Sequence, residues 1–149
     1  MHVSLLLGSK VDIEFAQKIA DFLKEYDVPS EIIVASAHKV PEKVVEVIEK
    51  LNKRTDPTVV ITVVGMSNGL GGVVAGSCVH PVIACPPFKD LADYQVNVHS
   101  SLQMPSDVPV MTVLNYKNAA LSALRILGES NEELKKKLLK RIEKMKNEY

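Results

Sequence analysis

The stretch TVVITVVGMSNGLGG, residues 58–72, is the part of the sequence that determines the fold class. Its first half, Thr58 to Val64, is an unbroken run of β-branched residues. Such a run is typical of a central strand in a parallel sheet, because both of its faces are buried. Its second half carries the glycines Gly65, Gly69, Gly71 and Gly72. The stretch therefore predicts a buried strand that ends in a glycine-rich turn.

Apolar segments on either side of this strand alternate with helical patterns. The predicted strands cover residues 3–7, 32–34, 58–64, 82–84 and 110–113. Apolar side chains recur at helical spacing in residues 13–23, 41–51 and 117–127, and a short helix is expected after the glycines. Asp12 is placed to cap the first helix, and Pro41 suits the first turn of the second.

Repeated strand–helix units with right-handed crossovers predict an α/β fold, a three-layer α/β/α sandwich around one parallel sheet. In a flavodoxin-like strand order, 2-1-3-4-5, the turns after the first and third strands lie on either side of one crevice. Residues 86–109 are too long for a simple connector between the last two strands. We therefore treat that segment as a candidate for function.

The chain has 149 residues, which suits a single domain. We expect residues 1–128 to form the α/β core and residues 129–149 to form an extra C-terminal helical arm. The apolar stripe of this arm consists of Leu134, Leu138, Ile142 and Met145. Either the domain itself or another subunit must cover this stripe.

Composition disfavours several classes of protein. Eighteen Lys and Arg residues balance 18 Asp and Glu residues, so no long-range field attracts nucleic acid or an anionic membrane. No apolar stretch is long enough to span a bilayer, and the N-terminus does not resemble a signal peptide. Cys78 and Cys85 match no zinc or redox motif, which predicts reduced, packed thiols in the cytoplasm. His80 and His99 lack partners at metal-ligand spacing, so we expect no metal site.

Three turns at the carboxyl ends of the first three strands are candidates for ligand binding. Residues 8–12 contain Ser9 and lead into a helix, so backbone N–H groups and the hydroxyl suit a phosphate or ribose. The same residues also suit a plain strand–helix turn. His38 follows the second strand beside Lys39. A histidine at this edge of the sheet suits acid–base catalysis, although an ordinary surface histidine is an open alternative.

The glycine-rich turn, residues 65–72, favours function over packing. Glycines let the backbone approach a ligand closely and let several N–H groups converge. Such a turn suits a carboxylate or carbon dioxide better than a bulky anion that needs arginine side chains.

Four segments together resemble the aminoimidazole ribonucleotide (AIR) carboxylase family of purine synthesis. They are Gly8-Ser9-Lys10-Val11-Asp12, Ser36-Ala37-His38-Lys39-Val40-Pro41, Gly65-Met66-Ser67-Asn68-Gly69-Leu70-Gly71 and Ser100-Ser101-Leu102-Gln103-Met104-Pro105. They follow the family's order and spacing between Val3 and Gly128. The resemblance implies carboxylation of AIR to 4-carboxy-5-aminoimidazole ribonucleotide (CAIR).

The resemblance also implies roles for individual residues. The residues that would bind the ribose and phosphate are Ser9, Asp12, Ser36 and Lys39, with Gly8 and Ala37 in the same turns. The residues that would hold carbon dioxide or the new carboxylate, mainly through backbone N–H groups, are Gly65, Ser67, Asn68 and Gly69. His38 would remove the proton from the ring carbon once the carboxyl group is attached.

The family has two branches, one using carbon dioxide directly and one moving a carboxylate from an N-carboxyamino group (N5-CAIR mutase). Residues 67–71, Lys39 and the segment 85–87 are similar to the direct branch. Gln103 instead resembles the mutase branch. Met66 stands where animal enzymes have arginine, and Val11 replaces a serine common in the first turn.

The resemblance implies partners and assembly as well. The ligands would be a small-molecule nucleotide and carbon dioxide, with no cofactor, because the electron-rich aminoimidazole ring needs no metal, biotin or ATP. Family members form homo-octamers with active sites at subunit junctions, which would explain the stripe on the C-terminal arm. A non-catalytic, flavodoxin-like nucleotide-binding module is the alternative of a different class.

Overall fold

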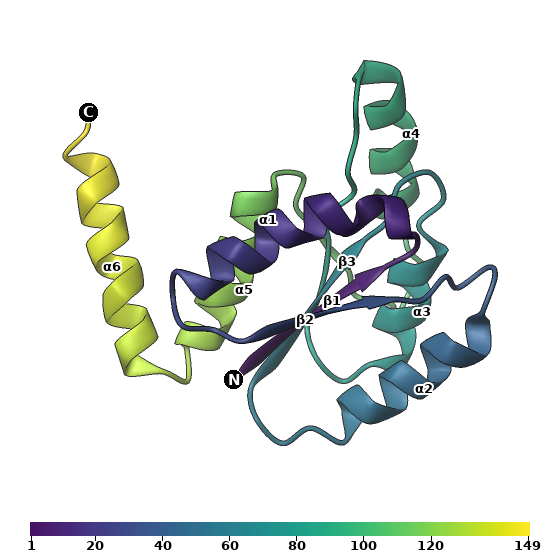
Figure 1. The fold of residues 1–149 in the computed structure, drawn as a ribbon, viewed down its shortest axis with the longest axis horizontal. Coiled ribbons are helices and arrows are strands. Elements are labelled where there is room, and N and C mark those ends of the chain that lie inside the picture. Colours follow the sequence, from purple (N-terminus) through teal and green to yellow (C-terminus); the bar gives the residue numbers. More distant parts are fainter.

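The computed structural model describes all residues, 1–149, and contains one five-stranded sheet whose strands are all parallel (Figure 1). The strands are β1 (His2–Leu7), β2 (Ser30–Val34), β3 (Thr58–Val63), β4 (Val82–Ala84) and β5 (Met111–Thr112). Their order in the sheet is β2-β1-β3-β4-β5. The flavodoxin-like order expected from the sequence is confirmed.

The strand β3 forms the centre of the sheet. All six of its residues are buried, as the β-branched run predicts. It pairs with β1 from His2–Thr58 to Leu7–Val63, and with β4 from Val60–Val82 to Thr62–Ala84.

Helices cover both faces of the sheet. They are α1 (Ile13–Lys24), α2 (Pro41–Asn52), α3 (Gly69–Ser77), α4 (Leu91–Leu102), α5 (Tyr116–Gly128) and α6 (Glu132–Lys146). Side chains of α1, α5 and α6 pack with Leu5 and Ile61 in one core cluster. Side chains of α2 and α3 pack with Leu6 and Val60 in a second cluster. Neighbouring residues of a strand point to opposite faces, so these two clusters are the two sides of a three-layer sandwich.

The capping role expected of Asp12 is wrong. The chain enters α1 through a short 3₁₀ helix, η1 (Lys10–Asp12), and the Ser9 hydroxyl accepts a hydrogen bond from the Val11 N–H at 3.4 Å. Asp12 already has helical backbone angles, φ −89° and ψ −1°, and its side chain makes no capping bond. A capping side chain needs an extended backbone to reach the first helical N–H groups, and Ser9 has that backbone.

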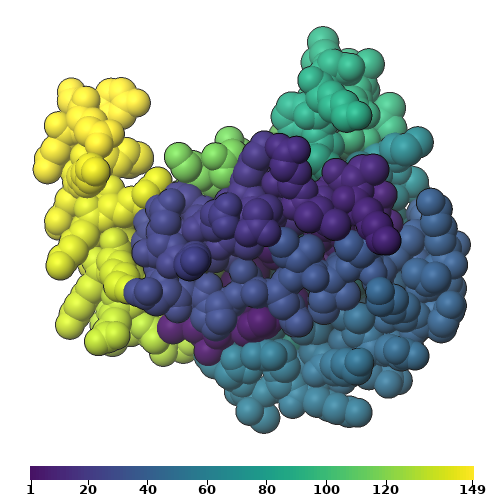
Figure 2. All heavy atoms as spheres, in the orientation of Figure 1, coloured from purple at the N-terminus to yellow at the C-terminus, as the bar shows by residue number.

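The long segment between β4 and β5 contains the helix α4, which the sequence pattern did not predict. Asp90 caps it by accepting a hydrogen bond from the Asp93 N–H at 2.9 Å. Figures 1 and 2 show α4 extending beyond the sheet and its covering helices.

The expected extra C-terminal helix is α6, which stands out in Figure 2. Leu134 and Leu138 are buried, whereas Met145 is 52% exposed, so the domain covers the first half of the apolar stripe. Gly128 is the last residue of α5 rather than a residue beyond it. It provides the room for α6, since a Cβ there would lie 3.3 Å from Leu138 Cδ1. None of the helices combines the length and the apolar character that crossing a membrane requires.

Candidate active site

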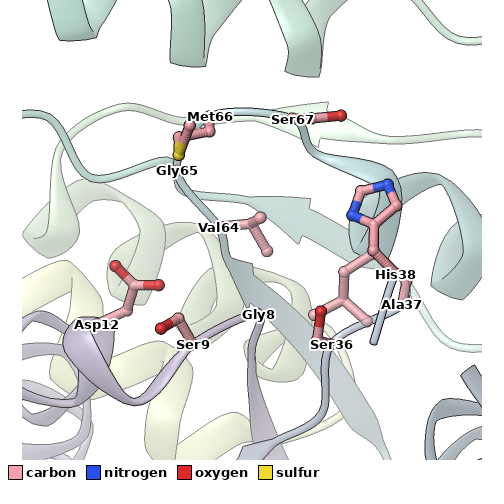
Figure 3. Close-up of a pocket in the computed structure, with 11 residues that line it drawn as sticks. Gly8, Ser9, Asp12, Ser36, Ala37, His38, Val64, Gly65, Met66 and Ser67 are labelled. Atoms are coloured by element: carbon pink, nitrogen blue, oxygen red, sulfur yellow. The ribbon is translucent and has the colours of Figure 1, made fainter. Parts of the chain in front are cut away.

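The carboxyl ends of β1, β2 and β3 surround a cavity of about 270 Å³ (Figure 3). Its lining residues are Gly8, Ser9, Asp12, Ser36, Ala37, His38, Val64, Gly65, Met66, Ser67 and Leu70. The chain leaves β1 toward one face of the sheet through α1, and leaves β2 and β3 toward the other through α2 and α3. The cavity therefore lies where the winding direction reverses, the usual ligand position in such sheets.

The structure brings most of the predicted site residues together. Those that line the cavity are Gly8, Ser9, Asp12, Ser36, Ala37, His38, Gly65 and Ser67. Lys39, Asn68 and Gly69 do not line it. Lys39 is exposed on the turn after β2, Asn68 is 5% exposed, and Gly69 lies directly behind His38.

The imidazole ring of His38 lies against the backbone of Gly69. A Cβ at position 69 would stand 2.8 Å from His38 Nε2 and 2.9 Å from Cε1, closer than real atoms approach. His38 is exposed and forms no hydrogen bond within the chain, so both ring nitrogens are available to a ligand. In Figure 3 the ring stands on one side of the cavity, and Ser9 and Asp12 stand on the other.

Asp12 is a half-buried carboxylate without a hydrogen bond or an ion pair in the chain. Burial raises its pKa above the ordinary value of 3.8. An unpaired carboxylate beside a cavity can accept hydrogen bonds from the hydroxyl groups of a ligand. The group thus costs stability in the free protein and is suited to binding a polyhydroxylated molecule.

The loop of residues 65–68 shapes the wall above His38 and Asp12. Its residue with positive φ is Met66, at 62°, and none of the glycines has a positive φ. The glycines instead provide space, since a Cβ at Gly65 would lie 3.3 Å from Asn97 Nδ2, and one at Gly71 would lie 2.7 Å from Asn68 Oδ1. The expected freedom of the glycines is therefore a matter of size rather than of backbone conformation.

Several N–H groups of this loop are already occupied. Those of Met66 and Asn68 donate to Asn97 Oδ1 at 2.5 Å and to Ser100 Oγ at 3.3 Å. The N–H groups of Gly65, Ser67 and Gly69 form no hydrogen bond within the chain. These three remain for a ligand.

The side chain of Asn68 is engaged inside the protein. Its Oδ1 accepts a hydrogen bond from the Gly71 N–H at 2.9 Å, which caps α3, and its Nδ2 donates to Ser101 Oγ at 2.9 Å. The Ser67 side chain has no such partner and lines the cavity. The polar side chain that this loop offers to a ligand is therefore that of Ser67.

A second cavity of about 410 Å³ adjoins the first and shares Asp12, Gly65 and Met66 with it. Sequence reasoning missed this extension, together with the contribution of Asn97, which lines it. The signal that was available is weak: a single polar residue between two valines in a segment without a clear amphipathic pattern.

The cysteines lie away from this chemistry. Burial raises the pKa of Cys85 to about 12, and it also raises the pKa of Cys78. Neither thiol is therefore an activated nucleophile. The His80 ring is hydrogen-bonded to the Leu51 carbonyl oxygen at 2.8 Å, away from the cavity.

Comparisons with known proteins agree on one family. A family model described as AIR carboxylase matches residues 2–148. A phosphoribosylaminoimidazole carboxylase from Archaeoglobus fulgidus is 38% identical over 93% of this chain and 76% of its own length. An N5-carboxyaminoimidazole ribonucleotide mutase from Methanocaldococcus jannaschii is 40% identical over 97% of this chain and 90% of its own.

A solved structure gives the same result. The crystal structure of Treponema denticola PurE superposes with a TM-score of 0.92 at 36% identity, covering 99% of this chain and 92% of that chain. The names of these relatives include both a carboxylase and a mutase.

We predict that Gly69→Ala displaces the His38 ring without unfolding the protein. The new Cβ would collide with the ring, while Ala suits a helix better than Gly does. Heteronuclear NMR should show shifted His38 ring resonances at an unchanged or raised Tm. The matched control is Gly76→Ala on the same helix, whose Cβ would meet Val108 at an ordinary 3.6 Å. Unchanged His38 resonances in Gly69→Ala would contradict this packing.

We predict that Asp12→Asn raises the Tm of the free protein at pH 7. Because the folded-state pKa is raised, the carboxylate destabilises the fold above that pKa, and the cost disappears as pH falls toward 3.8. The gain in Tm should therefore shrink on acidification. Glu25→Gln, an exposed change of the same charge on the turn after α1, is the control. An equal gain in both variants would point to overall charge rather than to burial of Asp12.

Proposed function

The chain belongs to the AIR carboxylase family, and from that premise we propose that it joins carbon dioxide to the ring carbon of AIR and so forms CAIR in purine biosynthesis. Members of the family are enzymes named as carboxylases or as N5-CAIR mutases. The observation that carries the proposal is the position of His38. Its unpaired ring lies beside a loop with three free N–H groups, at the edge of a cavity with hydroxyl and carboxylate groups on its far side.

The reaction needs one new bond and one proton transfer. The electron-rich ring carbon of AIR attacks carbon dioxide, and the new carbon–carbon bond leaves that carbon with both a hydrogen and a carboxylate. A neutral His38 nitrogen removes the hydrogen as a proton, and the electron pair of the carbon–hydrogen bond restores the aromatic ring. His38 then releases the proton to solvent. The protein contributes orientation and desolvation, and no cofactor takes part in this scheme.

The nucleotide portion would extend from the turn beside His38 across the cavity to Ser9 and Asp12. Asp12 would accept hydrogen bonds from the ribose hydroxyls, which compensates for its burial. The hydroxyls of Ser9 and Ser36 and the backbones of Gly8 and Ala37 would contact the ribose and phosphate. Lys39 lies outside the lining, and its long side chain would reach the phosphate from the rim.

The carboxylate would lie under the loop of residues 65–68. The free N–H groups of Gly65, Ser67 and Gly69, together with the Ser67 hydroxyl, would donate hydrogen bonds to it. The Gly69 N–H belongs to the first residue of α3, where the helix dipole also favours negative charge. Asn68 would support this loop from inside the protein.

The mutase reaction is the second candidate. In it, the carboxylate that reaches the ring carbon comes from an N-carboxyamino group rather than from dissolved carbon dioxide. Gln103 favours this branch, whereas relatives of similar identity carry the name of a carboxylase or of a mutase. Lys39 and residues 67–71 favour the direct branch. Family membership favours an enzyme of either branch over a non-catalytic nucleotide-binding module.

We further propose that the chain assembles into a homo-octamer in the cytoplasm. The distal half of α6 supports the assembly, because Leu139 is 54% and Met145 52% exposed and a neighbouring subunit would cover them. The unpaired thiols of Cys78 and Cys85 agree with a reducing compartment. The expected ligands are the nucleotide and carbon dioxide, without nucleic acid or membrane.

We predict that purified protein converts AIR into CAIR with bicarbonate as the carbon source and without ATP. The rate should follow dissolved carbon dioxide and rise when carbonic anhydrase speeds its supply. The same protein is then given N5-CAIR in buffer freed of bicarbonate. Product from N5-CAIR alone would assign the mutase branch, and no product from either substrate would remove the enzymatic proposal.

We predict that His38→Asn lowers carboxylation by about 10²- to 10⁴-fold, the contribution typical of a positioned acid–base group. Nucleotide affinity and Tm should stay near those of the wild type, because His38 is exposed and makes no bond within the chain. The matched control, His99→Asn, changes an exposed histidine on α4 and should keep full activity. Retained activity in His38→Asn would exclude His38 as the proton acceptor.

A further inference from the structure

The loop over the cavity is held from behind by side chains of α4. We propose that Asn97 and Ser100 are positioning residues, which hold Met66 in its left-handed conformation and thereby aim the Ser67 N–H at the carboxylate. This inference rests on the proposed function, since the carboxylate in question belongs to the proposed product. Asn97 and Ser100 themselves do not line the cavity around His38. Five hydrogen bonds and one backbone angle support the proposal.

Asn97 and Ser100 hold the two peptide groups of Met66. The Met66 N–H donates to Asn97 Oδ1 at 2.5 Å, and Ser100 Oγ donates to the Met66 carbonyl oxygen at 2.7 Å. Asn97 is itself held, because it is 2% exposed and its Nδ2 donates to the Pro87 carbonyl oxygen at 2.6 Å. The two residues are one helical turn apart, so they face the loop together.

These bonds maintain a conformation that Met66 would not otherwise adopt. Its φ is 62°, and a side chain with a Cβ disfavours that region. The side chain does not explain the conformation, since it is 74% exposed. Without its two partners on α4, the backbone of Met66 would relax toward an ordinary angle and turn the adjoining peptide groups.

The peptide between Met66 and Ser67 connects this contact to the cavity. In a planar trans peptide the carbonyl and the N–H point in opposite directions. Ser100 draws the Met66 carbonyl toward α4, so the Ser67 N–H points away from α4. Residues of α4 are absent from the lining of the cavity around His38, whereas Ser67 belongs to it. The contact at Ser100 therefore sets the direction of a hydrogen-bond donor on the other side of the loop.

The same helix also holds the next part of the loop. The Asn68 N–H donates to Ser100 Oγ at 3.3 Å, and the Asn68 side chain donates to Ser101 Oγ at 2.9 Å. Ser100 thus contacts residues on both sides of Ser67. Its hydroxyl is the best single group to remove in a test.

The experiment compares the affinities of the full-length protein for AIR and for CAIR, which differ by the carboxylate. In Ser100→Ala we expect the CAIR affinity to fall by about tenfold or more, as for the loss of a hydrogen bond to a charged group. The AIR affinity should change by less than about twofold, because the nucleotide side of the cavity is untouched. Ser100→Thr, which keeps the hydroxyl, should restore CAIR affinity. Gln95→Ala, an exposed change on α4, is the matched control.

The outcomes separate this inference from the proposed function. If the wild type binds neither nucleotide, the proposed function fails and the inference fails with it. If the wild type binds both nucleotides, two results in Ser100→Ala overturn the positioning role while the proposed function stands. In one, the affinities for AIR and CAIR fall equally; in the other, neither affinity changes. If Ser100→Ala does not fold, Ser100→Cys replaces it, because a thiol is a weaker donor of similar size. The CAIR affinity of that variant must fall while its AIR affinity stays unchanged.

Discussion

The hydrogen bonding of β3 to β1 on one side and to β4 on the other is the constraint on which the rest of the structure depends. Because the strands are parallel, every strand ends at the same edge of the sheet. Because α1 covers one face while α2 and α3 cover the other, the chain separates there and leaves a cavity. Ser9, His38 and Ser67 come from three different turns, and the sheet alone brings them together. The strand order therefore determines which turns form the site, and the side chains of those turns determine its chemistry.

The glycines of the site leave space for neighbouring side chains, and none of them adopts the positive φ that glycine usually provides. Gly69 leaves room for the His38 ring, Gly71 leaves room for the Asn68 side chain that caps α3, and Gly65 leaves room for Asn97. The strained backbone belongs to Met66 instead. Strain of this kind persists only where the surroundings hold it, and here α4 supplies both hydrogen bonds.

Local patterns predicted most of the fold and most of the cavity. The β-branched run at Thr58 reveals the central strand, and the alternation around it reveals the layers. Local patterns failed at α4, because its apolar residues Leu91, Val96 and Leu102 are exposed. Two of its three buried residues, Asn97 and Ser101, are polar, so burial does not follow an apolar stripe. Local patterns also misplaced the cap at Asp12, since a 3₁₀ turn intervenes. The contacts of Met66 join residues 31 and 34 positions apart, and no local spacing encodes them.

The projection of α4 beyond the sheet has a thermodynamic consequence. Asn97 and Ser100 of this helix bond the loop, and its exposed surface includes Val96 and Leu102, which are 58% and 59% exposed. Anything that contacts the exposed side and favours one geometry of the loop must, by linkage, alter affinity at the cavity by the same free energy with which a bound ligand alters that contact. Binding at the outer surface of α4 and binding in the cavity would then be coupled reciprocally through the loop.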